Sequence, residues 1–376
     1  MYKISLPVIS NNPDCRGTSN APGAVSPRLN QPFLTGVIDT PAGIVPRVSS
    51  TLTWKDSRDQ FKARWGVGRM NYSIEPGLYA LNNPDAASPV LVTANYKMSF
   101  DKLRQALPGQ NLWILVLDTK GINVWCAAGK GTFGTEELVS KIENCRLKET
   151  VNHRNIILPQ LGAPGVAAHE AKKRTGFKVY YGPVRSRDLA AYLDNGFKAD
   201  SKMRTVTFAL RDRAVLIPIE IVEVIKPFFL LALIFLVLGG IGGSGSYLSN
   251  MLTYGLFAIM GLLAAIIAGA VLSPVLLPYL PGRAFSVKGF FIGIIAAIAL
   301  LYVRGVNFSA WPDRIEALSW LLIIPSIASY LAMNFTGAST YTSLSGVKKE
   351  MRFALPIQIC AAIFGALLWL TSRLIS

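Results

Sequence analysis

The chain has 376 residues, with 38 lysines and arginines against 22 aspartates and glutamates, and 51% of the residues are hydrophobic. This length allows two ordinary domains. The net charge of +16 raises the possibility of nucleic-acid binding. The cationic residues, however, are dispersed and lack the interleaved aromatic residues of a strand-binding platform, so no nucleic-acid partner is expected. The four cysteines form no close pair and no CxxC motif, which argues against a disulfide framework and against an iron–sulfur or zinc site.

Residues 1–81 are predicted to be a flexible N-terminal tail and lead-in. The segment up to Asn30 is rich in proline, asparagine and serine and has no continuous apolar stretch, so no signal peptide is predicted. A segment spaced by proline and glycine follows, through about Leu81. The first folded domain is therefore expected to begin after this point.

Residues 82–212 are predicted to form an α/β domain. Apolar runs of strand length alternate there with stretches of helical spacing, which is typical of a parallel sheet covered by helices. The predicted strands are 90–93, 112–118, 155–159 and 178–181, and the helices lie near 100–107, 136–145, 166–174 and 187–194. A last strand at 206–210 is expected to close the sheet before a hinge at 211–218.

The segments that follow the four strands are small, rich in glycine and mostly uncharged. Ligands of open parallel sheets bind beyond the carboxyl ends of the strands, so these segments are where a site is expected. Their composition suits a large flat ligand that rests on peptide groups. No catalytic acid or base is evident among them.

Cys126 follows the second predicted strand within the segment 123–130, NVWCAAGK. If Asn123 caps a short helix, Cys126 lies in its first turn, where the helix dipole favours a thiolate. A lone cysteine is more often a small core residue, and from spacing alone both interpretations stay open. The run 129–134 formally matches GxGxxG, but it does not follow the first strand directly and no acidic residue ends the next strand, which argues against nicotinamide binding.

The run 119–134, TKGINVWCAAGKGTFG, resembles the signature of the corrinoid protein of the mercury-methylating pair. Further agreement lies in segments 92–95, 158–165 and 181–185, and the resemblance extends from about Pro89 to the C-terminus. It implies a flavodoxin-like or Rossmann-like cobalamin-binding domain, related to the large subunit of the corrinoid iron–sulfur protein. It also implies base-off cobalamin with Cys126 as the lower axial cobalt ligand.

The strand-end rule and this resemblance together give a set of candidate cofactor-binding residues. Cys126 is the candidate catalytic residue and metal ligand. The full set is Thr93, Asn95, Ser99, Ile122, Asn123, Val124, Trp125, Cys126, Ala127, Gln160, Leu161, Gly162, Ala163, Gly165, Val166, Gly182, Pro183 and Val184.

The resemblance implies methyl transfer from cobalt to Hg(II), which forms methylmercury. A thiolate is a strong donor, and donation trans to a cobalt–methyl bond helps the methyl group to leave as a carbanion equivalent. Two electrons are then needed to restore Co(I), and the chain has no redox centre of its own. The implied partners are a ferredoxin-like protein with two 4Fe–4S clusters and an upstream folate-linked methyl donor.

Residues 213–376 are predicted to be an all-α transmembrane domain of about five helices. The apolar runs are 219–238, 251–272, 290–303, 317–335 and 355–370, and most approach the ~20 residues that cross a bilayer core. The first run contains Glu220, Glu223 and Lys226, so a count of four stays open. Positive charges in two alternate loops predict a cytoplasmic (inner) membrane location with the N-terminal domain in the cytoplasm.

Two alternative functions remain. One is a membrane-anchored corrinoid methyl carrier whose acceptor is another thiol or a metalloid. The other is a transporter or sensor in which the α/β domain gates the bundle. Ionisable residues within a membrane mark ion or substrate paths, and apart from Glu220, Glu223 and Lys226 the predicted spans contain none. This favours an anchor bound to membrane lipid.

Overall fold

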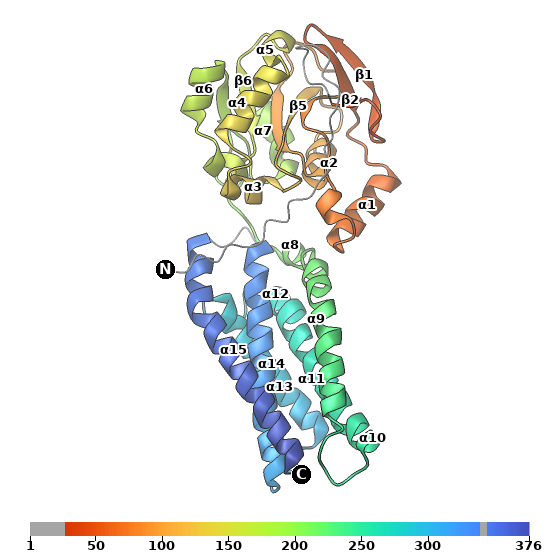
Figure 1. The fold of residues 1–376 in the computed structure, drawn as a ribbon. Helices are drawn as coiled ribbons and strands as arrows, with labels where there is room; N and C mark the ends of the chain where they lie inside the picture. The colour runs from red at the N-terminus through yellow and green to blue at the C-terminus, as the bar shows by residue number, and fades with distance from the viewer. Residues whose placement is uncertain (1–26, 339–343, 376) are drawn as a thin grey trace.

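The computed structural model describes residues 27–338 and 344–375. An α/β domain lies at one end and a helical bundle at the other (Figure 1). The chain passes between them through a short connection that leads into α8, Leu210–Ala214. The first 26 residues of the predicted tail lie outside the described residues.

A seven-stranded mixed sheet forms the centre of the α/β domain. Its order is β1-β2-β3-β5-β4-β6-β7, and β5, β4, β6 and β7 are parallel neighbours. These four strands agree with the predicted ones. The bounds are β1 Leu34–Thr40, β2 Gly43–Val48, β3 Gly77–Leu81, β4 Val90–Ala94, β5 Leu112–Leu117, β6 Asn155–Leu158 and β7 Lys178–Tyr181.

Three sequence-based expectations are wrong here. Residues 34–81 are no mere lead-in, because β1, β2, β3 and helix α1, Trp54–Arg64, belong to the domain. Since β3 runs antiparallel to β5, the sheet is mixed and not purely parallel. The strand expected at 206–210 is absent, and Phe208 packs instead against Phe335 of the bundle, with ring centroids 6.0 Å apart.

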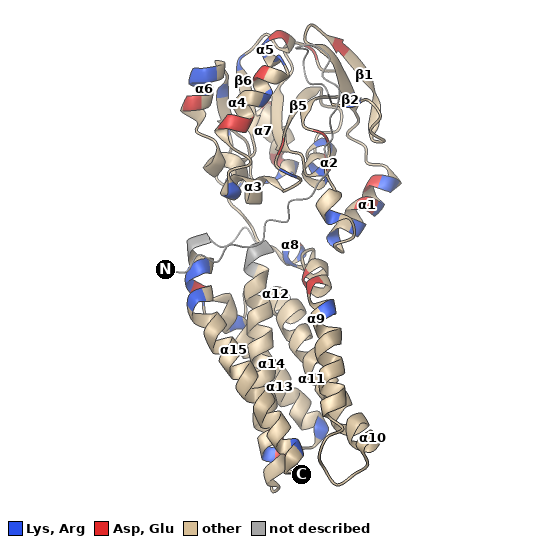
Figure 2. Ribbon diagram, viewed as in Figure 1, with Lys and Arg blue, Asp and Glu red and all other residues tan. Residues whose placement is uncertain are grey.

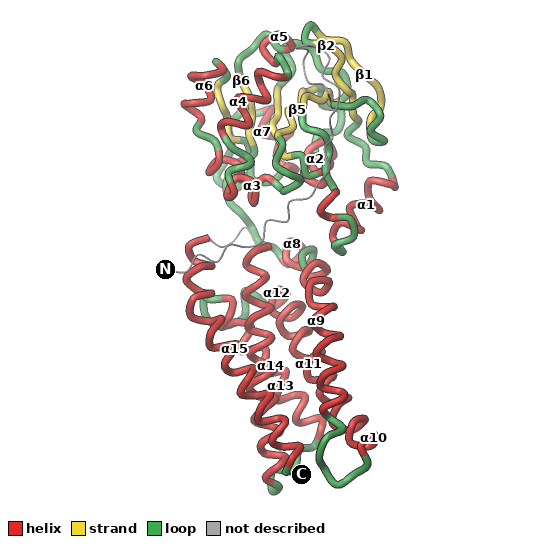
Figure 3. The backbone as a smooth tube through the Cα atoms, viewed as in Figure 1, coloured by secondary structure: helices red, strands yellow, loops and turns green. Residues whose placement is uncertain are grey.

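Helices cover both faces of the sheet, and Figure 3 shows them flanking the strands. One hydrophobic cluster joins α3, α4 and α6 to one face, with Leu115 and Val92 at its centre. The second joins α2 and α7 to the other face through Ile114 and Leu91, as expected from the alternation of side chains along a strand. The helix bounds are α2 Lys97–Gln105, α3 Val124–Lys130, α4 Thr135–Asn144, α5 Leu147–Thr150, α6 Ala168–Thr175 and α7 Leu189–Asp194.

The bundle contains five helical segments that are long and apolar enough to cross a membrane, at 210–238, 247–276, 285–304, 311–335 and 346–374 of the described residues. This agrees with the prediction of about five apolar helices and not with the alternative of four. The second segment is continuous through two π-helical turns. The bounds are α9 Ile217–Leu238, α10 Tyr247–Asn250, η4 Met251–Gly255, α11 Leu256–Ile266, η5 Ile267–Leu272, α12 Ser273–Leu276, α13 Phe285–Arg304, α14 Trp311–Ala338 and α15 Leu344–Leu374.

A buried ion pair lies at the end of the bundle remote from the α/β domain. Arg373 Nη2 is 3.0 Å from Glu316 Oε2, and both side chains are almost fully buried. Arg304 Nη2 lies 3.3 Å from Glu316 Oε1. The expectation that only Glu220, Glu223 and Lys226 are ionisable within the helical segments is therefore wrong, because α14 and α15 extend beyond the predicted apolar runs.

Candidate functional site

A cavity of about 320 Å³ lies at the carboxyl ends of the parallel strands. Strand β4 has β5 on one side and β6 on the other, so the connections after β4 and β6 diverge and leave a crevice between them. Part of the lining was predicted from sequence: Thr93, Ser99, Asn123, Val124, Trp125, Leu161, Pro183 and Val184. The rest comes from the strands, from α2 and α7 and from the connections after β6 and β7: Leu91, Val92, Leu103, Ile157, Leu158, Pro159, Ser186 and Leu189.

Helix α3 carries Cys126 beside this cavity. Asn123 is its N-cap, as predicted, and Asn123 Oδ1 accepts a hydrogen bond of 2.9 Å from the Cys126 backbone N–H. The Cys126 thiol is free and partly exposed. Cys145, by contrast, is buried in α/β packing, and burial raises the pKa of its thiol to about 11. Of these two thiols, Cys126 is the one available to a ligand.

Asn95 organises the loop that leads into α3. Its Oδ1 accepts hydrogen bonds from the Thr119 backbone N–H at 3.1 Å, the Thr119 hydroxyl at 2.8 Å and the Gly121 N–H at 2.9 Å. Its Nδ2 donates to Asp118 Oδ1 at 3.2 Å. The side chain is buried, so it acts on the site by holding the loop after β5.

Two glycines of η2, Gln160–Gly165, allow close packing beneath α3. A Cβ added at Gly165 would lie 2.0 Å from the Phe133 carbonyl oxygen and 3.2 Å from Ala128 Cα. At Gly162 it would lie 2.5 Å from the Phe133 ring. The absence of side chains at these positions lets the segment after β6 contact α3 and the turn that follows it, which fixes the helix that bears Cys126.

Arg204 closes one side of the site through the loop after β7. Its Nη1 donates to the Gly182 carbonyl oxygen at 3.1 Å and also to Gln160 Oε1. Arg185 forms an ion pair with Asp212 at 2.6 Å, which connects the same loop to α8 at the start of the bundle. These contacts link the positions of η2, the β7 loop and the first bundle residues.

The structure divides the predicted site residues into two groups. One group lines the cavity, as given above. The other supports the walls from behind or beside them: Ala127 and Val166 are buried in the core cluster, and the Val166 carbonyl accepts a hydrogen bond from the Tyr181 hydroxyl at 2.9 Å. Besides these two, this second group contains Asn95, Ile122, Cys126, Gln160, Gly162, Ala163, Gly165 and Gly182.

Most of the cavity residues that sequence reasoning missed lie within strands and helices, whereas Pro159 and Ser186 lie in the connections after β6 and β7. Leu103 and Leu189 belong to the apolar faces of α2 and α7. The helical spacing of these leucines was the available signal. Among the described lining residues there is no carboxylate, histidine or lysine, so the cavity offers apolar contacts, hydroxyls and peptide groups.

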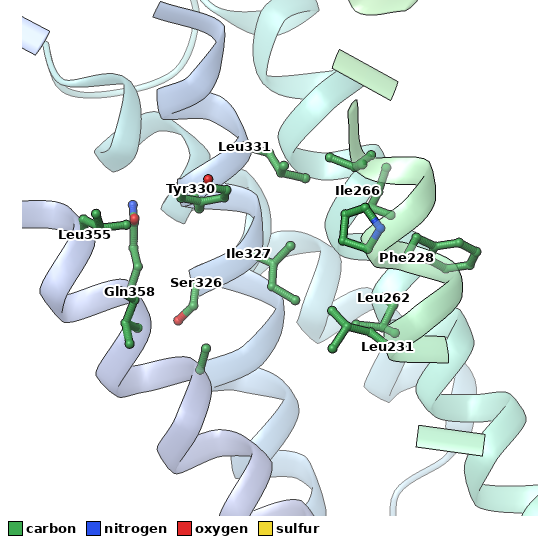
Figure 4. Close-up of a pocket in the computed structure, with 14 residues that line it drawn as sticks. Phe228, Leu231, Leu262, Ile266, Ser326, Ile327, Tyr330, Leu331, Leu355 and Gln358 are labelled. Atoms are coloured by element: carbon green, nitrogen blue, oxygen red, sulfur yellow. The ribbon is translucent and has the colours of Figure 1, made fainter. Parts of the chain in front are cut away.

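A second cavity, of about 430 Å³, lies between α9, α11, α14 and α15 (Figure 4). Apolar side chains such as Phe228, Leu262 and Ile327 make up most of its lining. Ser326, Tyr330 and Gln358 are its polar members, and Gln358 Nε2 donates to Ser329 Oγ at 2.8 Å. It contains no carboxylate, cysteine, histidine, lysine or arginine among the described lining residues, so the first cavity, beside Cys126, is the better candidate for chemistry.

The α/β domain is similar to proteins of known families. Residues 68–193 match the family described as CO dehydrogenase/acetyl-CoA synthase delta subunit. Over 131 residues the chain is 32% identical to the acetyl-CoA decarbonylase/synthase complex subunit gamma of Archaeoglobus fulgidus. The aligned segment covers 34% of this chain and 27% of that protein. The corresponding subunit of Methanopyrus kandleri is 32% identical over 123 residues, which cover 32% of this chain and 26% of that subunit. The subunit of Methanocaldococcus jannaschii is 32% identical over 131 residues, which cover 34% of this chain and 26% of that subunit.

The chain thus spans about a quarter of the length of the curated relatives that it matches. The matched segment includes β3 to β7 and the whole cavity, whereas β1, β2, α1 and the bundle lie outside the residues matched by the family. The greater part of the α/β domain is therefore similar in sequence to a segment of the gamma subunit of the acetyl-CoA decarbonylase/synthase complex.

Proposed function

We propose that this chain is a membrane-anchored, corrinoid-dependent methyltransferase, with the Cys126 thiolate as the lower axial ligand of cobalt. The observation that carries the proposal is the placement of Cys126. Its thiol is partly exposed, its helix is capped by Asn123, and the residues just before it line the switch-point cavity. The similarity of residues 68–193 to a methyl-transfer complex supports the same class of chemistry.

The residues of the site fit a corrinoid in composition. A corrinoid is larger than a cavity of about 320 Å³, so the cavity would take up part of it, with the remainder against α3 and η2. The glycines at 162 and 165 provide peptide groups without side chains, and the lining has no charged group to desolvate. In base-off cobalamin the cofactor's own base does not bind cobalt. A protein side chain could then take that position below the metal.

The chain contributes a soft donor in a fixed orientation. A bound corrinoid would supply a methyl group on cobalt, and Cys126 would set the electron density on that metal through its sulfur. Such ligation would use the sulfur of Cys126 in the first turn of α3. Asn95 and the η2 glycines hold the helix, so the sulfur position does not depend on the ligand.

Hg(II) is the acceptor that we propose, with methylmercury as the product. This part rests on the resemblance of segment 119–134 to the mercury-methylating family and on the softness of both the metal and the methyl donor. The similarity to acetyl-CoA decarbonylase/synthase subunits favours a second candidate, a corrinoid methyl carrier that delivers to another acceptor. A ferredoxin-like protein with two 4Fe–4S clusters and a folate-linked methyl donor complete the proposed cycle.

The bundle is proposed to anchor the site to the cytoplasmic side of the inner membrane. Lysines and arginines lie at the end of the bundle next to the α/β domain, as Figure 2 shows for the start of α15 and for α8. This distribution supports a cytoplasmic position of the domain by the positive-inside rule. A few cations also lie at the opposite end, where Arg373 and Arg304 pair with Glu316.

The test is the absorption spectrum of the full-length protein, purified in detergent and loaded with methylcobalamin. We expect a base-off, sulfur-ligated spectrum for the native chain and loss of sulfur ligation in Cys126→Ala. Cys360→Ala is the matched control, because Cys360 is a free, exposed cysteine of α15. Absence of corrinoid binding by the native chain would contradict the proposal.

A single-turnover assay then separates the two acceptors. The loaded protein is mixed with Hg(II) or with a small thiol, and methylated products are measured. Methylmercury formation that depends on Cys126 supports the first candidate. Methylation of the thiol without methylmercury supports the carrier.

A further inference from the structure

Helix α1 has its polar and apolar faces inverted relative to an ordinary surface helix. Trp54, Arg58, Phe61 and Trp65 follow one another at helical spacing and share one face, with Trp65 at the C-cap. The three aromatic side chains on this face are 75%, 61% and 38% exposed, in chain order. The residues buried on the opposite face are Asp56, Gln60 and Ala63.

The inversion has a structural cause on the buried side. Asp56 accepts hydrogen bonds from Lys97 Nζ at 2.7 Å and Arg104 Nη2 at 3.0 Å, and its helix begins with a capping box on Thr53. Gln60 Nε2 lies 3.4 Å from Asp101 Oδ2 of the same network. The polar face of α1 is therefore needed inside the domain, but this does not explain aromatic residues on the outside.

The exposed apolar surface continues beyond the helix and is bordered by cations. Val67 is 61% exposed and Met70, in η1 Arg69–Asn71, is 86% exposed. Lys55, Arg58 and Lys62 are exposed beside the aromatic residues, and the Arg58 guanidinium lies 5.4 Å from the Trp54 ring centroid. Large apolar side chains rimmed by lysine and arginine are typical of segments that lie in a membrane interface.

The position of α1 relative to the bundle agrees with that role. A Cβ added at Gly66 would lie 3.2 Å from Val222 Cγ1 and 3.4 Å from Ile219 Cδ1, so the chain just after α1 packs on the first turns of α9. Figure 1 shows α1 at the end of the α/β domain that faces the bundle, beside the start of α9, and Figure 2 shows the cations on it. The first turns of α9 also carry Glu223, which is exposed, and Glu220, which is buried.

We propose that this surface, the α1 face (Trp54, Lys55, Arg58, Phe61, Lys62, Trp65, Val67 and Met70), lies on the membrane leaflet next to the α/β domain and binds anionic phospholipid headgroups. The proposal rests on the membrane anchoring proposed above. Tryptophan and other amphipathic side chains concentrate at the headgroup level, and each nearby cation adds attraction to an anionic leaflet. A protein partner would not account for the contact between Gly66 and the start of the first apolar helix.

The α1 face gives the α/β domain a second attachment to the membrane. The first is the covalent connection through α8, which alone allows the domain to tilt. With the α1 face on the leaflet, the domain is held at two points, and the cavity beside Cys126 keeps a fixed height above the lipid. An acceptor or reductant that arrives from the membrane surface would meet the site in one orientation.

The test is a nitroxide probe on the full-length chain in nanodiscs of phosphatidylethanolamine and phosphatidylglycerol. Cys15, Cys126 and Cys360 are replaced by Ala, and single cysteines are introduced as Met70→Cys, Leu233→Cys and Val37→Cys. Leu233 is exposed on α9, and Val37 is exposed on β1 at the far end of the domain. Collision rates with oxygen and with a water-soluble nickel complex report whether each probe lies in lipid or water.

We expect the probes at 70 and 233 to show a several-fold loss of nickel collisions relative to the probe at 37. Charge reversal of Lys55, Arg58 and Lys62 to Glu, or discs of phosphatidylcholine alone, should return the probe at 70 toward the water value. If 233 is in lipid but 70 is as accessible as 37, the α1 face does not bind the leaflet, while the anchor stands. If 233 is in water, membrane anchoring itself fails and this proposal fails with it.

Discussion

The α/β domain and the helical bundle place apolar and charged side chains in opposite ways. In the domain, the central strands β3, β4 and β5 are buried along their whole length, including their leucines, valines and isoleucine. In the bundle, Phe229 and Leu233 of α9 are exposed, whereas Glu316 and Arg373 are buried. The two regions of one chain are therefore built for different surroundings.

Helix α1 belongs to the domain by its position in the sequence and its contacts, but it follows the pattern of the bundle. Its aromatic residues are outside and its carboxylate, Asp56, is inside. This difference shows that the environment of a segment, and not its domain, decides which face is apolar. The proposed membrane region therefore includes α1, which precedes residue 213 in the chain. A boundary defined by position relative to the membrane describes the molecule better than one defined by residue number.

The largest expected effect concerns the buried ion pair of the bundle. Arg373→Leu would leave Glu316 buried with only Arg304 nearby, and loss of one partner of a buried pair typically costs about 3–5 kcal/mol of unfolding free energy. Unfolding of the full-length protein in detergent, followed by circular dichroism, measures it. Arg352→Leu, at an exposed position of α15, is the control and should change stability by less than about 0.5 kcal/mol. Equal stability of the two variants would show that the ion pair between Arg373 and Glu316 does not stabilise the bundle.

A matched pair of leucine substitutions compares the two regions directly. Leu115 of β5 is fully buried, and Leu115→Ala should cost about 2–5 kcal/mol because it leaves a cavity. Leu233 of α9 is exposed, and Leu233→Ala should cost less than about 1 kcal/mol in detergent, because it removes no packed neighbour. Denaturant unfolding of both variants provides the measurement. A large loss for Leu233→Ala would mean that this face of α9 packs on protein and not on lipid.

The sequence predicted those elements whose pattern is local and strong. Strands β4 to β7 are short apolar runs between turns, and the five helical segments are long apolar runs. Strands β1 and β2 were missed because they lie at the sheet edge, with Val37 and Ile44 exposed and Pro46 within β2. The alternating run at 206–210 was taken for a strand, but Phe208 packs on the bundle, a tertiary contact that the local pattern does not contain.

The site was predictable to the same extent. The N-cap of α3 and the position of Cys126 follow from neighbouring residues, and the strand-end rule located much of the cavity. The function of Asn95 did not follow, because its partners Thr119 and Gly121 are 24 and 26 residues away in the chain. A polar residue after a strand looks the same in sequence whether it contacts a ligand or holds a loop.

Asn95→Ala distinguishes these two functions, and its expected effect on stability is smaller than that of Arg373→Leu or Leu115→Ala. The substitution leaves the backbone N–H groups of Thr119 and Gly121 without their acceptor, while the Thr119 hydroxyl keeps the Ile122 carbonyl oxygen at 2.6 Å, and the loss should lower the unfolding free energy by about 1–3 kcal/mol. Because the loop leads directly into α3, methylcobalamin should also bind more weakly. At saturating cofactor the spectrum should still show sulfur ligation, since Cys126 is retained.

The control for this substitution is Asn83→Ala, which removes an exposed hydrogen bond from Arg47 and no residue of the cavity lining, and should change stability by less than about 0.5 kcal/mol. Denaturant unfolding and titration with methylcobalamin give the two readouts. Weaker binding with unchanged stability would mean that Asn95 contacts the cofactor directly. Loss of stability together with weaker binding would mean that the residue acts through the loop, and then the geometry of Cys126 depends on a hydrogen-bonded contact between β4 and the connection after β5.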